Sequence, residues 1–120
     1  MGPAHEVLVI DDDQSLRLLC RVNLELDGHE VNEAASLDAA RAVLAERGDL
    51  IELVLLDVHV GVENGLTLLD ELRRARPELP VVLLTGESGL PAEARDDARE
   101  VLSKPFDITE LSTVVRRLLG

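Results

Sequence analysis

The sequence predicts an α/β fold in which five parallel strands and five helices alternate as (βα)5 to form a doubly wound sheet. Three observations support this prediction. Short, unbroken apolar runs are typical of strands that are buried on both faces. Segments with helical periodicity fill the gaps between these runs. Polar residues that can carry chemistry follow the runs directly, where an open α/β sheet binds its ligands.

Five strands are predicted in chain order. The unbroken apolar runs are Val7–Ile10, Leu53–Leu56 and Val81–Leu84. Two weaker strands fit Glu30–Ala34 and Glu100–Ser103. The segment Glu30–Ala34 is polar and alternating, as expected for a strand at the edge of a sheet.

The first two helices follow the first two strands. Gly28 could end the first helix, whose stripe is Leu16, Leu19, Cys20, Asn23 and Leu24. Ser36 is a candidate N-cap of the second helix, and Gly48 lies beyond its end. The stripe of that helix is Leu37, Ala40, Val43 and Leu44.

The remaining three helices differ in strength. Pro77 terminates the third, whose stripe is Leu66, Leu69 and Leu72. The fourth, within Pro91–Arg99, is mostly alanine and charge and has little to bury. Asp107 is a candidate N-cap of the last helix, whose stripe is Ile108, Leu111, Val114, Val115 and Leu118.

Length and composition limit the possible functions. A chain of 120 residues that is 46% hydrophobic predicts one folded domain, and residues 1–120 are assigned to it. The net charge of −12 argues against direct nucleic-acid binding and suits a divalent cation or a basic partner surface. No apolar stretch approaches the roughly 18 residues of a membrane span, which predicts a cytoplasmic protein with no membrane partner. Cys20 has no second cysteine to pair with.

Candidate functional residues stand at four strand ends. Asp11, Asp12 and Asp13 follow the first strand, Asp57 follows the third, and Thr85 and Lys104 end the fourth and fifth. Lys104 is the only lysine in the chain. Crowded carboxylates need a counter-charge, and Mg²⁺ accepts carboxylate and phosphate oxygens together. A carboxylate beside such an ion can attack phosphorus.

These residues carry a resemblance to a known family. The segments Val7–Asp13, Leu53–Asp57, Val81–Gly86 and Leu102–Phe106 resemble the motifs of the receiver domains of bacterial two-component response regulators. The resemblance runs from about Glu6 to Leu119. It implies a flavodoxin-like fold with strand order 2-1-3-4-5.

The resemblance also implies roles for the site residues. Asp57 is the expected phosphoryl acceptor, and Thr85 and Lys104 are expected to grip the phosphoryl group. The carboxylates of Asp11, Asp12 and Asp57 would hold Mg²⁺ (or Mn²⁺), together with the main-chain carbonyl of His59. Such a domain is a signalling phosphoacceptor rather than an enzyme in its own right.

Further implied features concern the loops. The side chains of His59 and Glu87 are expected to tune the lifetime of the phosphoryl group. Thr85 and position 101 form the expected switch, although Val101 stands where many relatives carry an aromatic ring. The resemblance implies a cis peptide bond between Lys104 and Pro105, and a glycine at Gly65.

Other departures affect the loop regions. Gly61 stands where the family often has proline, which would loosen the loop after the acceptor. The span from Thr85 to Lys104 is about three residues shorter than usual, which would clip the fourth helix or its following loop.

The implied partners are a histidine kinase or phosphotransfer protein and an output domain or downstream protein, with a phosphorylation-linked homodimer as a further option. The chain is either a complete regulator or a piece of a longer one. Two alternatives stay open. Asp11 and Asp13 also fit the Asp-x-Asp of haloacid-dehalogenase-like phosphatases. The altered output face also leaves open a phosphorylation-independent interaction module, although the full set of site residues argues against it.

Overall fold

The computed structural model describes residues 5–86 and 89–120. Its main sheet contains five parallel strands in the order β2-β1-β3-β6-β7. Counted within this sheet, that order is the predicted 2-1-3-4-5. The strands are β1 (Glu6–Ile10), β2 (Glu30–Ala34), β3 (Ile51–Asp57), β6 (Val81–Thr85) and β7 (Glu100–Ser103).

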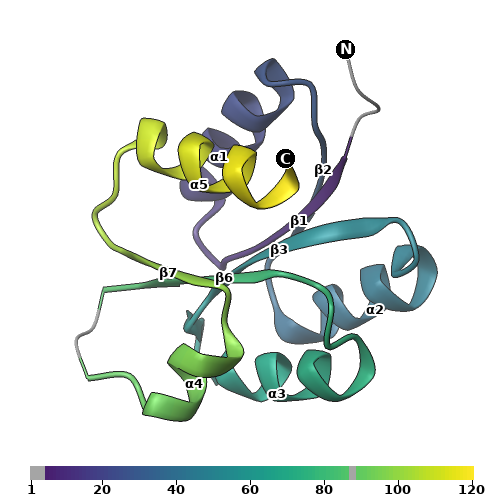
Figure 1. Ribbon diagram of the computed structural model, residues 1–120, viewed down its shortest axis with the longest axis vertical. Coiled ribbons are helices and arrows are strands. Elements are labelled where there is room, and N and C mark those ends of the chain that lie inside the picture. The colour runs from purple at the N-terminus through teal and green to yellow at the C-terminus, as the bar shows by residue number, and fades with distance from the viewer. Residues whose placement is uncertain (1–4, 87–88) are drawn as a thin grey trace.

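Helices cover both faces of this sheet (Figure 1). One face carries α1 (Gln14–Leu26) and α5 (Ile108–Leu119), and the other carries α2 (Leu37–Arg47), α3 (Leu66–Ala75) and α4 (Ala92–Asp97). Successive residues of β1 therefore enter different cores: Leu8 and Ile10 join the α2–α3 side, and Val7 and Val9 join the α1–α5 side. This two-sided burial explains why the central strands are unbroken apolar runs.

Local signals position the helix ends as predicted. The Ser36 hydroxyl accepts a hydrogen bond from the Ala39 N–H at 3.0 Å. Asp107 and Glu110 form a reciprocal capping box at the start of α5. Gly28 adopts φ 92° immediately after the end of α1, a left-handed conformation that a glycine reaches without strain. The peptide bond between Lys104 and Pro105 is cis, as the family resemblance implied.

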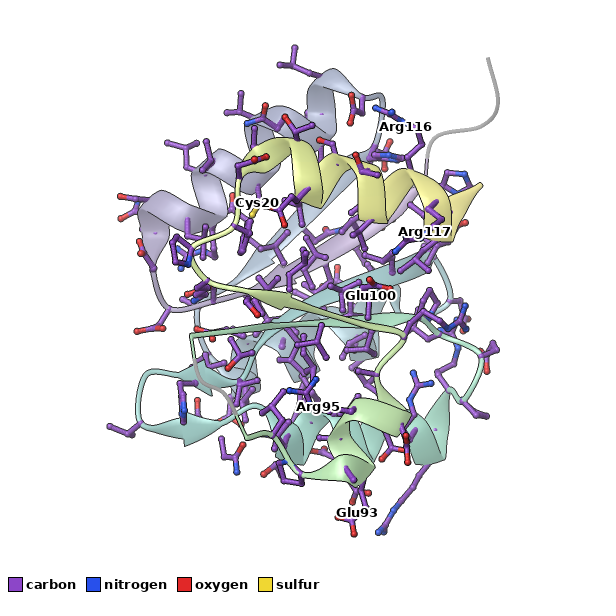
Figure 2. The ribbon with its side chains drawn as sticks, turned by 60° about the vertical axis from the view of Figure 1, so that its left-hand side comes forward. Cys20, Glu93, Arg95, Glu100, Arg116 and Arg117 are labelled. Atoms are coloured by element: carbon purple, nitrogen blue, oxygen red, sulfur yellow. The ribbon has the colours of Figure 1, made fainter. Side chains whose placement is uncertain are left out.

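Side chains on the α1–α5 side and along β7 can be followed in Figure 2. Cys20 is fully buried between α1 and the sheet, as part of the core beneath α5. Glu100 on β7 faces Arg117 on α5, with the Arg117 Nη2 and Glu100 Oε2 atoms 3.0 Å apart. On the opposite side of the sheet, Glu93 and Arg95 project from α4 into solvent.

The loop after β3 folds into an antiparallel hairpin of β4 (His59–Val60) and β5 (Glu63–Asn64), which the sequence did not predict. That Gly61 loosens this loop stays a prediction. Leu19 is 47% exposed and lies outside the core stripe of α1. The weak fourth helix is confirmed, since α4 has only six residues. No helix in the described part of the chain is both long and apolar enough to span a bilayer.

Candidate functional site

The carboxyl ends of four strands bring the predicted polar residues to one edge of the sheet. Asp11 follows β1, Asp57 ends β3, Thr85 ends β6 and Lys104 follows β7. The neighbouring pairs β1·β3, β3·β6 and β6·β7 are all parallel, so these ends lie side by side. The Lys104 N–H also donates to the Thr85 carbonyl at 2.7 Å, which extends the pairing of β6 and β7 into the site.

Asp11 is held through both its backbone and its side chain. It is fully buried, and its N–H donates to the Ala34 carbonyl of β2 at 3.1 Å. Its Oδ1 accepts from the Asp13 N–H at 2.9 Å. Its Oδ2 accepts from the Lys104 ammonium at 3.1 Å. The carboxylate therefore has a fixed direction into the site.

Asp57 shares the same ammonium. Its side chain is nearly buried, and Lys104 Nζ lies 3.3 Å from its Oδ2. Its Oδ1 accepts a hydrogen bond from the His59 N–H at 3.2 Å. Lys104 thus bridges two carboxylates that come from different strands.

Gly65 closes the chain tightly against the backbone of Asp57. The Gly65 N–H donates to the Val58 carbonyl at 2.7 Å. A Cβ at position 65 would lie only 2.2 Å from the main-chain oxygen of Asp57. The absence of a side chain at this position therefore permits the β3–α3 turn that holds Asp57 in place.

Charge and burial perturb the titration of the site. The pKa of Asp57 is raised, first because burial disfavours its charged form and second because the Asp11 carboxylate is close. Burial lowers the pKa of Lys104, but the hydrogen bond and charge of Asp11, followed by the charge of Asp57, outweigh it and raise that pKa overall. Lys104 is therefore charged at neutral pH.

The carboxylates form a candidate cation site. Asp11, Asp12 and Asp57 each place one oxygen within 4.8 Å of the others. Burial, followed by the charge of Asp11, raises the pKa of Asp57, so a bound cation would favour its ionised form. An all-oxygen set with two buried members and the exposed Asp12 suits a hard divalent ion that keeps some of its water.

The other predicted residues are placed as follows. Thr85 is buried at the end of β6, and the side chain of His59 is exposed. Val101 is half-buried on β7 and packs against the core beneath α3 and α4. Glu87 lies outside the described residues. Arg17 was not predicted as a site residue, but its Nη1 donates to the Asp11 carbonyl at 2.7 Å.

Comparison with known proteins identifies the family. The family profile described as response regulator receiver domain matches residues 7–116. The chain belongs to this family. As a receiver domain it is 37% identical over 124 residues to the DNA-binding transcriptional regulator NtrC of Bradyrhizobium sp. (strain RP501 Parasponia), covering 98% of this chain and 25% of that protein.

Solved receiver structures agree with this assignment. NtrX from Brucella abortus superposes with a TM-score of 0.86 at 35% identity, over 97% of this receiver and 27% of that chain. The isolated receiver domain of NtrX gives a TM-score of 0.84 at 35% identity and covers 94% and 97% of the two chains. The present receiver spans about a quarter of the length of its first curated relatives.

Family membership argues against the phosphatase alternative, and so does the role of Asp13. The Asp13 Oδ1 accepts from the N–H groups of Ser15 at 2.9 Å and Leu16 at 3.2 Å. This carboxylate is therefore engaged as the N-cap of α1. It is not positioned as the second carboxylate of an Asp-x-Asp phosphatase.

Proposed function

We propose that this receiver accepts a phosphoryl group on Asp57, in a Mg²⁺-dependent (or Mn²⁺-dependent) transfer from a histidine kinase or phosphotransfer protein. The observation that carries the proposal is the shared ammonium of Lys104, which lies 3.1 Å from Asp11 Oδ2 and 3.3 Å from Asp57 Oδ2. The cluster unites a nearly buried carboxylate nucleophile, a cation for phosphoryl oxygens and carboxylates for a metal ion.

In the proposed transfer, a carboxylate oxygen of Asp57 attacks the phosphorus of a phosphohistidine. The new P–O bond forms as the P–N bond breaks, and the imidazole leaves with the electron pair of that bond. Lys104 and the Thr85 hydroxyl bind phosphoryl oxygens and offset their charge. The attacking oxygen needs no proton removed, because Asp57 reacts as a carboxylate.

The carboxylates of Asp11, Asp12 and Asp57 and the main-chain carbonyl of His59 would hold the metal ion. When bound, Mg²⁺ supplies positive charge to the phosphoryl oxygens as they approach Asp57. The buried Asp11 gives this set a rigid anchor, and the exposed Asp12 leaves room for metal-bound water.

The partners follow from the same assignment. Relatives include transcriptional regulators about four times longer than this chain, and a sensor kinase, CckA of Brucella abortus. We assign residues 1–120 to a single receiver domain that controls an output domain or downstream protein in the cytoplasm. A solved relative, the beryllofluoride-activated receiver domain of NtrC4, is a dimer, which supports a phosphorylation-linked homodimer as an option for this chain.

We propose that the conformational response to phosphorylation starts at Thr85. Its hydroxyl would move toward the phosphoryl group, and Val101 has too little side-chain freedom to swing into the vacated space as an aromatic ring would. The shift would therefore be absorbed by residues 86–99, where the short α4 buries only Ala94. His59 and Glu87 are proposed to set the lifetime of the phosphoryl group, and His59→Ala would then alter the rate of its loss.

Intact-mass measurement with acetyl phosphate and Mg²⁺ tests the acceptor. We expect one acid-labile phosphoryl group on the natural chain and none on Asp57→Asn. Asp70→Asn is the matched control, because Asp70 is an exposed aspartate on α3. Full labelling of Asp57→Asn would refute the assignment, and steady turnover of donor by that variant would indicate a phosphatase. A natural chain that takes no label would favour the interaction module.

A further inference from the structure

We infer that Arg17 is a positioning residue for the cation site, which it serves by locking the Asp11–Asp12 peptide in place. Three observations identify it. Arg17 Nη1 donates to the Asp11 carbonyl at 2.7 Å. Its Nε donates to Glu33 Oε1 on β2 at 3.1 Å. Its side chain is only 14% exposed. The inference rests on the proposed metal-dependent function and deepens it.

The carbonyl of Asp11 matters because it belongs to the peptide that leads into Asp12. That peptide is planar, so fixing its oxygen also fixes the direction in which the backbone enters Asp12. The Asp11 N–H is tied separately to the Ala34 carbonyl. Asp12 itself is exposed and has no core packing to orient it. The guanidinium of Arg17 is thus well placed to hold Asp12 within reach of the cation.

Glu33 holds Arg17 in its working orientation. Its two oxygens are divided between two arginines of α1: Oε1 accepts from Arg17, and Oε2 accepts from Arg21 Nη1 at 2.8 Å. Arg21 is 45% exposed and also pairs with Glu25. Arg21 therefore shares the helix, the charge and the Glu33 partner of Arg17. The contact with Asp11 is made by Arg17, which makes Arg21 a matched control.

The direction of the change in Mg²⁺ affinity distinguishes a positioning role of Arg17 from a purely electrostatic one. Removing a cation beside a metal site should strengthen Mg²⁺ binding if only electrostatics acted. If Arg17 positions the acidic loop, its removal should weaken binding instead. Hydrogen bonds that orient metal ligands from outside typically change affinity by about 10–100-fold when lost. We expect a loss of Mg²⁺ affinity at the lower end of this range, about tenfold, because the carboxylates of Asp11 and Asp57 keep their contacts with Lys104.

The test is a Mg²⁺ titration followed by amide NMR shifts of residues 11–13 and 57–59. Arg17→Met is compared with Arg21→Met and with the natural chain, after urea unfolding has shown that each variant is folded. Arg17→Lys is the second variant. It keeps the charge but lacks the two-pronged fork that spans the Asp11 carbonyl and Glu33, so we expect it to bind Mg²⁺ more weakly than the natural chain.

About tenfold weaker binding by Arg17→Met, with Arg21→Met within twofold of the natural chain, would support the inference. Unchanged or tighter binding by Arg17→Met would overturn it, as would equal weakening by both variants. In those cases the natural chain still binds Mg²⁺ and takes label on Asp57, so the proposed function survives. A natural chain with no saturable shifts at residues 11–13 would overturn the inference and the proposed metal dependence together.

Discussion

Replacing Gly65 with alanine should destabilise the receiver strongly through a steric clash with the backbone of Asp57. The new Cβ would lie 2.2 Å from the Asp57 oxygen and 3.2 Å from the Val58 oxygen. A carbon and an oxygen ordinarily approach to about 3.3 Å. Both neighbours are backbone atoms, so the turn itself must move by about 1 Å. Overpacking of this kind typically costs about 1–3 kcal/mol, and we expect about 3 kcal/mol in the free energy of unfolding.

Two other glycines provide controls that separate clash from backbone strain. Gly61 has φ 63°, and no atom of the described residues lies within 4 Å of an added Cβ, so Gly61→Ala should cost about 1 kcal/mol from strain alone. Gly86 has neither a positive φ nor a described atom within 4 Å, so Gly86→Ala should stay within about 0.5 kcal/mol.

Urea unfolding followed by far-UV circular dichroism measures these losses, since the chain has no tryptophan or tyrosine. With a slope of about 1.5 kcal/mol per molar urea, the Gly65→Ala midpoint should fall by about 2 M. A loss smaller than that of Gly61→Ala would refute the steric argument.

Three further predictions concern charge and readout. Asp57→Asn should raise the free energy of unfolding at pH 7 without Mg²⁺, because burial and Asp11 raise the pKa of Asp57 and its ionised form costs stability. This gain in stability should shrink as the pH falls through the raised pKa of Asp57. Urea unfolding at several pH values tests this, and an Asp57→Asn variant that is less stable than the natural chain at pH 7 would contradict the prediction. Burial, with a smaller contribution from His5, lowers the pKa of His29, so the unfolded chain takes up protons first and stability should fall as pH drops below about 6.5. His29→Gln should flatten that dependence between pH 7 and 5, and an unchanged slope would exclude His29 as its source. Beryllofluoride with Mg²⁺ should change hydrogen exchange within residues 86–99, and changes confined to β7 and α5 would contradict the proposed readout.

The sequence predicted most of the fold because two-sided burial leaves a clear pattern. Every residue of β1 and β6 is buried, so the unbroken apolar runs of both strands could be recognised directly in the sequence. The site followed from the fold, since parallel strands that each end in a polar residue must present those residues along one edge. The weak segment at residues 91–99 was also interpreted correctly, because alanine and charge give a helix little to bury.

The features that sequence reasoning missed depend on tertiary contacts. The hairpin after Asp57 has strands of two residues, too short for any periodic signal, although the φ of 63° at Gly61 suits its turn. Leu19 was placed on the same helix face as Cys20 and Leu24, yet it is 47% exposed, because the helical period alone does not limit how wide the buried part of a stripe is. Arg17 was missed because its partner Glu33 lies 16 residues away on β2. The sequence predicted that strand but not which of its side chains would face α1.

The charge balance of the site links its stability to its chemistry. Burial and the nearby Asp11 carboxylate outweigh the single Lys104 ammonium, so the pKa of Asp57 stays raised despite the 3.3 Å contact. The fully buried strand β1 and the largely buried strand β3 hold the two groups together against their repulsion. Anything that neutralises Asp57 or adds positive charge therefore acts in the same direction, whether it is a proton, an amide substitution or a divalent ion. For that reason the free energy of unfolding without Mg²⁺ and the Mg²⁺ affinity should be inversely correlated across substitutions at Asp11, Asp57 and Lys104, because removing a carboxylate relieves repulsion but also removes a ligand. Arg17→Met should depart from that correlation, because it alters the direction of the ligands rather than the charge they carry.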